Sequence, residues 1–128
     1  MNVVLDTCTF LWLAASPERI SPAARASIDD ELNTLFLSDV SVWEITLKHA
    51  MGKLSLPAPP RIWVPEQAAF FQLRRLAIEP SVLYLSGELP LVHRDPFDRL
   101  LAAQSQCVAM TILTPDQPFR DLGAETIW

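Results

Sequence analysis

Short apolar runs alternate in this chain with longer segments whose apolar residues recur at helical spacing. The strand-like runs are NVVL at 2–5, TLFL at 34–37 and VAMTIL at 108–113, with weaker ones at 76–78 and 124–128. Helical patterning covers 7–15, 22–30, 38–50, 66–75, 81–88 and 96–106, and LPAPP at 56–60 indicates a turn or extended connection. Strands separated by helices pair in parallel, with helices on both faces. We predict an α/β fold, a single three-layer domain over residues 1–128 with a mostly parallel central sheet.

The composition favours one folded domain outside the membrane. Half of the residues are apolar and one fifth are charged, which is typical of a globule rather than of a disordered chain. No apolar run approaches the roughly 18 to 20 residues of a membrane-spanning helix, and MNVVLD lacks the pattern of a signal peptide. Cys8 and Cys107 are far apart in the sequence and indicate two free thiols. We expect a cytoplasmic protein with no membrane partner.

The net charge of −5 argues against generic nucleic-acid binding, which normally shows a basic surface. The charges are unevenly distributed, however. Seven of the ten basic residues lie between Lys48 and Arg99, where only five of the fifteen acids occur. One or two divalent cations bound to the acidic remainder would also offset part of its charge. Overall charge therefore leaves a nucleic-acid substrate open.

Acidic residues lie close to one end of the predicted sheet, either directly after a strand or early in a helix next to a strand. Asp6 follows the first strand directly, and Glu44 lies early in the helix after the second. Asp95 and Asp98 open the helix before VAMTIL, and Asp116 follows that run. Ligands of parallel sheets bind beyond the carboxyl ends of the strands. Carboxylates gathered there suit Mg²⁺ or Mn²⁺, which can activate water and stabilise charge on a phosphoryl group.

Structural roles compete with this interpretation. Asp95-Pro96-Phe97-Asp98 has the form of a helix N-cap, and Thr114-Pro115-Asp116-Gln117 has the same form with Thr114 as the cap. Glu44 could be a solvent-facing helical residue. Asp6 is the hardest to explain structurally, because a carboxylate at the end of a buried strand needs partners or a metal.

Other polar and aromatic residues are weaker candidates. His93 precedes the DPFD segment and could act as a general base, but the sequence shows no serine or cysteine nucleophile arranged for it. Cys8 is near Asp6 without a second soft ligand, so packing is favoured over zinc. Packing is also favoured over base stacking for the four tryptophans, Trp12, Trp43, Trp63 and Trp128.

Four segments together resemble the signature segments of VapC-type PIN domains, in the same order and over essentially the whole chain. They are VVLDTCTFLWL, SDVSVWEITLKHAMGKL, HRDPFDRLLAAQ and TILTPDQPF. The resemblance implies a metal-dependent endoribonuclease that uses Mg²⁺ or Mn²⁺, usually the toxin of a type II toxin–antitoxin pair. It also implies an RNA substrate and a cognate antitoxin, and we expect a homodimer.

The motifs assign roles residue by residue. Asp6, Glu44, Asp98 and Asp116 match the four acids that hold metal and carry catalysis, with Asp95 as a near neighbour. The supporting positions are Thr7, Ser41, Arg99 and Thr114. Of these, Arg99, together with the neighbouring Arg94, could orient phosphate or pair with the acids. Cys8 and Pro115 depart from the usual residues of the family without removing an acid.

Two alternatives remain. A phosphatase of the haloacid-dehalogenase type also places an acid after its first strand, but it needs a second aspartate two residues later, where this chain has Cys8. A non-catalytic PIN-like binding domain would use the acids only as helix caps. The second alternative predicts no thermal stabilisation by Mg²⁺ or Mn²⁺.

Overall fold

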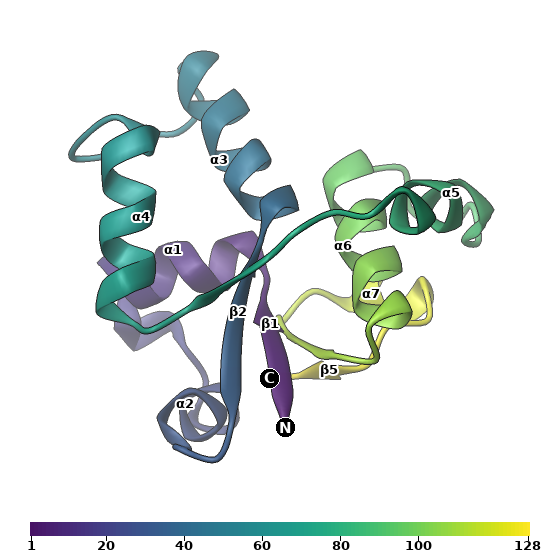
Figure 1. Ribbon diagram of the computed structural model, residues 1–128, viewed down its shortest axis with the longest axis horizontal. Coiled ribbons are helices and arrows are strands. Elements are labelled where there is room, and N and C mark those ends of the chain that lie inside the picture. The colour runs from purple at the N-terminus through teal and green to yellow at the C-terminus, as the bar shows by residue number, and fades with distance from the viewer.

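The central strand β1 (Asn2–Leu5) is the apolar run nearest the N-terminus, and it pairs on both sides within a fully parallel sheet (Figure 1). The computed structural model describes all 128 residues. The sheet has five strands in the order β3-β2-β1-β4-β5. The other strands are β2 (Thr34–Ser38), β3 (Arg74–Leu76), β4 (Thr111–Leu113) and β5 (Thr126–Ile127). The predicted parallel sheet is confirmed.

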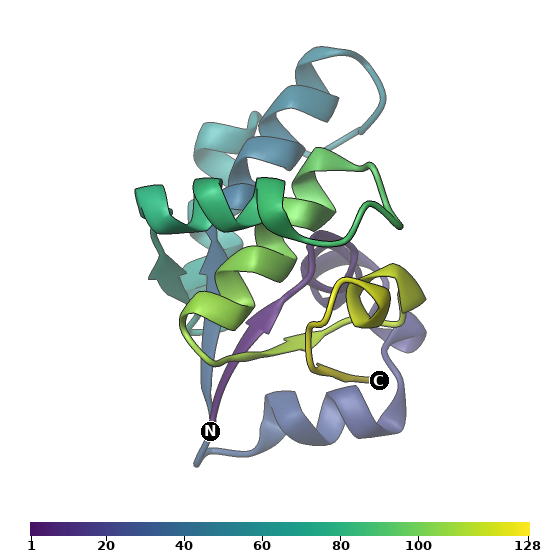
Figure 2. The same ribbon diagram turned by 90° about the vertical axis from the view of Figure 1, so that its right-hand side faces the viewer.

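Helices cover both faces of this sheet. They are α1 (Thr7–Ala15), α2 (Pro22–Asp29), α3 (Asp39–Ala50), α4 (Pro60–Phe70), α5 (Pro80–Glu88), α6 (Pro96–Cys107) and α7 (Gln117–Asp121), with a short 3₁₀ turn at Pro17–Arg19. Figure 1 shows α1, α2 and α4 on one side of β1 and β2, and α5, α6 and α7 on the other; Figure 2 gives the same arrangement after a quarter turn. No helix is both long and apolar enough to cross a membrane.

The alternation of side chains along β1 divides the core in two. Val3 and Leu5 belong to a cluster of twelve buried residues with Phe10 and Trp63, whereas Val4 belongs to a second cluster of twelve with Leu101. Successive strand residues point to opposite faces, so the three buried residues of β1 supply both layers. This explains why Val3, Val4 and Leu5 are all apolar rather than alternating with polar residues.

The prediction was wrong at the strand expected over 108–113. Helix α6 continues to Cys107, and Ala109 has a positive φ of 54°. The N–H of Met110 donates to the carbonyl of Ser105 at 2.9 Å and closes the helix end. Only 111–113 remain for β4. An apolar run by itself does not say whether its first residues end a helix or begin a strand.

A similar shift affects the helix expected at 66–75. Helix α4 begins earlier, at Pro60, and ends at Phe70, after which Gln72 has a φ of 56°. Strand β3 therefore occupies 74–76 rather than 76–78. Proline is favoured in the first turn of a helix, because an N–H group there would have no partner within the helix and its absence costs nothing. This allows α4 to start inside the proline-rich segment.

The order of the strands in the sheet determines where a binding crevice forms. β1 connects through α1 and α2 to β2 on one side, while its other neighbour, β4, comes from the distant end of the chain. Strands β2 and β3 are thus added on one side of β1, and β4 and β5 on the other, so the strand order reverses between β1 and β4. A crevice forms beyond the carboxyl ends of strands at such a point. Asp6 and the loop after β4 lie there.

Candidate metal centre

An acidic cleft of about 340 Å³ lies beyond the carboxyl end of β1. Its walls come from the start of α1, from α3 and the turn after it, from the start of α6 and from the loop after β4. Five carboxylates and two lysines line it: Asp6, Glu44, Asp95, Asp98, Asp116, Lys48 and Lys53. The structure thus gathers every acid that the sequence placed at this edge of the sheet.

Asp6 is the most deeply placed acid. It is 4 % exposed, and its carboxylate accepts from the Thr7 N–H at 2.7 Å, from the Thr114 hydroxyl at 2.8 Å and from the Cys8 thiol at 3.3 Å. No lysine or arginine pairs with it. Burial raises the pKa of Asp6 to about 7; the Asp98 carboxylate adds to this rise and the Thr114 hydroxyl opposes it. The site therefore orients this carboxylate without neutralising its charge.

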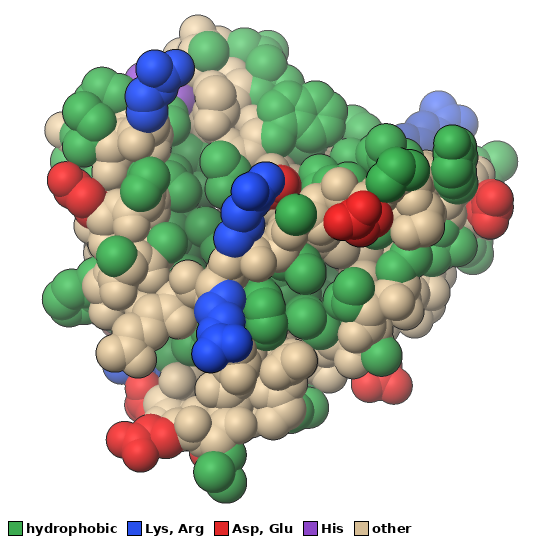
Figure 3. Space-filling model, viewed as in Figure 1, with side chains coloured by type: hydrophobic (Ala, Val, Ile, Leu, Met, Phe, Trp, Pro, Cys, Tyr) green, Lys and Arg blue, Asp and Glu red, His purple; other side chains and the backbone are tan.

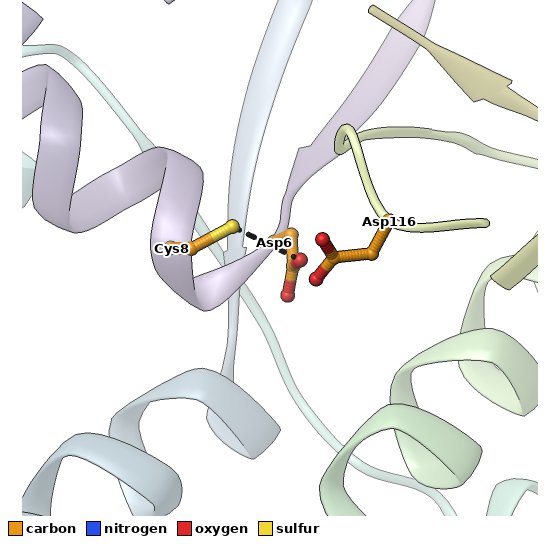
Figure 4. A group of neighbouring side chains, drawn as sticks. All are labelled: Asp6, Cys8 and Asp116. Carbon is orange, nitrogen blue, oxygen red and sulfur yellow. Dashed lines mark hydrogen bonds between the residues drawn. The ribbon is translucent and has the colours of Figure 1, made fainter. Parts of the chain in front are cut away.

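Asp116 faces Asp6 across the cleft. Figure 4 shows the two carboxylates turned toward each other, with the Cys8 sulfur beside Asp6. One ligand atom from each of these three residues lies within 4.8 Å of the others. The Asp116 side chain caps no helix: α7 begins at Gln117, and the Thr114 hydroxyl accepts from the Asp116 N–H at 3.1 Å. The expected cap formed by Thr114 thus holds the backbone and leaves the Asp116 carboxylate free.

Glu44 lies on α3 and is not solvent-facing, since it is 8 % exposed. One turn later, the Lys48 ammonium donates to Glu44 Oε2. That hydrogen bond raises the pKa of Lys48 above its usual value, and the charges of Glu44, Asp95 and Asp98 add to the effect. Sequence reasoning did not single out Lys48. The i, i+4 spacing of glutamate and lysine on one helix was the available signal.

Asp95 and Asp98 enter the cleft from the start of α6. Asp95 Oδ1 accepts from the N–H groups of Phe97 and Asp98, at 2.9 and 3.1 Å, so the capping interpretation holds for this residue. Asp98 caps nothing and accepts from His93 Nε2 at 2.7 Å. Burial raises the pKa of Asp98, as do the charges of Asp95 and Glu44, while the His93 hydrogen bond lowers it. His93, which the sequence offered only as a weak candidate for a general base, thus forms a hydrogen bond with an acid of the cleft.

The supporting residues differ in their contacts. The Thr7 hydroxyl donates to Ser41 Oγ at 2.9 Å and joins the starts of α1 and α3. Arg99 does not face the acids: its guanidinium donates to four backbone carbonyls in the last turn of α5 and in the connection from α5 to α6. These carbonyls belong to Ser86, Leu89, Pro90 and His93. Arg99 therefore holds the connection before the DPFD segment together instead of orienting phosphate or pairing with the acids.

The donor set fits a hard divalent cation. The acids offer carboxylate oxygens, and the exposed Asp116 leaves the site open to solvent on one side. Burial and the neighbouring Asp6 raise the pKa of the Cys8 thiol, so Cys8 stays protonated and donates to Asp6. A soft metal would need a thiolate. The five carboxylates outnumber the two lysines, and this excess of negative charge suits Mg²⁺ or Mn²⁺.

A larger hollow, of about 760 Å³, lies between α3, α4 and β3 but has different chemistry. Its floor is apolar, and its single acid, Asp39, forms a two-point ion pair with Arg75. Figure 3 shows this face, with apolar side chains inside the hollow and basic ones along its edge. The hollow has no cluster of free acids and is not a candidate metal centre.

Comparisons with known proteins agree with the fold. The PIN domain family model matches residues 3–125. Ribonuclease VapC22 of Mycobacterium tuberculosis is 29% identical over 120 residues, which cover 93% of this chain and 90% of that protein. A second relative, ribonuclease VapC16 of the same organism, is 36% identical over 56 residues, or 44% of this chain and 36% of that protein.

Two solved structures share the fold at low sequence identity. One is VapBC2 from Rickettsia felis bound to a promoter DNA fragment, with a TM-score of 0.73, 15% identity and coverage of 98% of this chain and 97% of that chain. The other is DNA-bound VapBC from Salmonella typhimurium, with a TM-score of 0.71, 17% identity and coverage of 98% and 96%. The chain belongs to the PIN domain family and is a VapC-type member of it.

Proposed function

We propose that this protein is a metal-dependent endoribonuclease that cleaves RNA phosphodiester bonds, with residues 1–128 acting as one nuclease domain. The observation that carries the proposal is Asp6, a buried carboxylate without a cationic partner that faces Asp116 in an acidic cleft. Such a carboxylate is costly to keep charged unless a cation binds beside it. Membership of the VapC type supplies the class of reaction.

In this proposal Asp6, Glu44, Asp98 and Asp116 hold Mg²⁺ or Mn²⁺. When bound, the cation supplies a Lewis acid that stabilises charge on the phosphoryl group. The chain contributes orientation: three donors fix the Asp6 carboxylate, and His93 fixes that of Asp98. Asp95 helps indirectly, because its cap directs the start of α6 into the cleft.

Cleavage of a mixed RNA pool tests this function. Purified protein is incubated with the pool, with and without Mn²⁺, and the cut ends are mapped. The wild type should cut only with metal, and Asp6→Asn should lose activity by a factor of at least about 100. Asp29→Asn is the matched control, since Asp29 is an exposed acid on α2 that pairs with Arg25. Equal cleavage by Asp6→Asn and wild type, with contaminating nuclease excluded, would refute the proposal; intact RNA throughout would favour a non-catalytic binding domain.

We also propose that the protein is the toxin of a type II pair, neutralised by a cognate antitoxin. Two structural neighbours are VapBC proteins, and the chain shares their fold over almost its whole length. Co-expression with the product of the neighbouring gene should yield a complex that no longer cuts RNA. A homodimer remains our prediction, with the exposed Phe70 and its neighbour Phe71 as one candidate contact. Light scattering of the purified protein would decide it.

A further inference from the structure

Lys48 contacts an acid of the proposed metal centre. Its ammonium donates to Glu44 Oε2, and the two residues lie one turn apart on α3. The Glu44 side chain is 10 % exposed and that of Lys48 is 42 % exposed. The carboxylate is thus part of the cleft wall, whereas the ammonium reaches it from the mouth. A long lysine side chain can leave such a contact for solvent without any movement of the helix.

Lys48 differs in this respect from the other cation of the cleft. Lys53 also lines it, but no ion pair joins Lys53 to a carboxylate. The ammonium of Lys48 is also 5.9 Å from the ring centroid of Phe97, which packs against Trp43. An aromatic face attracts a cation and holds it near this position. Lys48 and Lys53 thus carry the same charge in one cleft, but only Lys48 pairs with a proposed metal ligand, Glu44.

A divalent cation cannot share Glu44 with this ammonium without cost. The ammonium holds Oε2 of Glu44, and its positive charge repels a cation that binds the same carboxylate. Coordination by Glu44 therefore favours the release of Lys48 from this carboxylate. The displaced ammonium would remain at the mouth of the cleft, on the side from which a substrate must approach. A flexible ammonium suits a single phosphate oxygen in that place.

We propose that Lys48 is an exchangeable counterion that neutralises Glu44 before metal binds and is then released to contact a phosphate of the RNA. The second step rests on the proposed function. The exchange couples the two ligands, because metal binding frees a group that RNA uses. By linkage, RNA must then increase metal affinity by the same factor.

The first test measures Mn²⁺ binding without RNA, from the electron paramagnetic resonance signal of free Mn²⁺. Lys48→Met keeps the length of the side chain and removes the charge, and it should bind Mn²⁺ about tenfold more tightly than wild type. Lys53→Met removes an equal charge from the same cleft and should change affinity by less than about threefold. Lys48→Arg keeps a cation and should remain near wild type. Circular dichroism melts of all variants establish that they fold.

The second test measures binding of a non-cleavable, 2′-O-methylated RNA by fluorescence anisotropy, with and without Mn²⁺. Mn²⁺ should strengthen RNA binding by wild type and by Lys53→Met, but much less by Lys48→Met. Unchanged or weaker Mn²⁺ binding by Lys48→Met would overturn the exchange, as would equal tightening by both methionine variants. If the wild type neither binds nor cuts RNA, the proposed function and the phosphate contact fail together, while the Mn²⁺ titration still decides the exchange.

Discussion

Asp6→Asn should stabilise the metal-free protein while it destroys the site. In the folded protein burial raises the pKa of Asp6 from 3.8 to about 7. A raised carboxyl pKa means that the folded state holds a proton which the unfolded chain gives up above pH 3.8. The stability that this bound proton gives the folded state is fully present below pH 3.8 and is lost as the pH rises through 7. At pH 8 the charged Asp6 therefore costs about 4 kcal/mol, at 1.36 kcal/mol for each pKa unit.

The asparagine amide removes this charge but changes the hydrogen bonds. Its oxygen can still accept from the Thr7 N–H, whereas its amino group replaces the oxygen that accepts from Thr114 and Cys8. Losing those bonds costs about 2 kcal/mol. The net gain is about 2 kcal/mol, or roughly 6 to 10 °C in melting temperature for a domain of this size. A site built for a cation is thus expected to limit the stability of the empty protein.

Thermal unfolding followed by circular dichroism in EDTA measures this difference. At pH 8 Asp6→Asn should melt above wild type, and at pH 5 most of the gain should disappear, because wild-type Asp6 is then protonated. Saturating Mn²⁺ should raise the melting temperature of wild type and leave that of Asp6→Asn unchanged. Asp29→Asn, on the exposed surface of α2, should follow wild type throughout. The reasoning fails if Asp6→Asn melts below wild type in EDTA at pH 8, or if Mn²⁺ stabilises both equally.

Three further outcomes follow from the same contacts. Apparent Mn²⁺ affinity, measured by calorimetry, should rise with pH up to about 7 and then level, because the metal competes with the proton on Asp6; a flat profile from pH 5 to 8 would contradict this. Thr114→Val removes a donor to Asp6 and an acceptor of the Asp116 N–H. It should therefore lower the free energy of unfolding by about 1 to 3 kcal/mol and reduce cleavage. The control variant Thr46→Val on α3 should leave cleavage unchanged. Arg99→Met should destabilise the fold in urea by about 2 to 4 kcal/mol, because four carbonyls lose their donor, and an unchanged urea midpoint would refute that role.

The sequence alone determined the fold class and most of the acidic set. Strand β1 was predicted with its observed bounds, because a short run with three consecutive apolar residues that ends at an acid is typical of a buried strand. The meeting of Asp6 with Asp116 was predictable as well, since parallel strands deliver their carboxyl ends to one edge. Capping by Asp95 was one of the two interpretations that the sequence left open, because capping depends only on residues within one turn.

Only the tertiary structure decided what depends on distant partners. The pKa of Asp6 depends on how completely other segments bury it, which no local pattern reports. Arg99 had the charge of a phosphate ligand, but the carbonyls within its reach gave it a structural role. Lys48 was visible as half of a helical ion pair, yet its importance comes from the three other segments that bring acids around it. Local sequence thus specified which groups were present, and packing specified which charges remained without a partner.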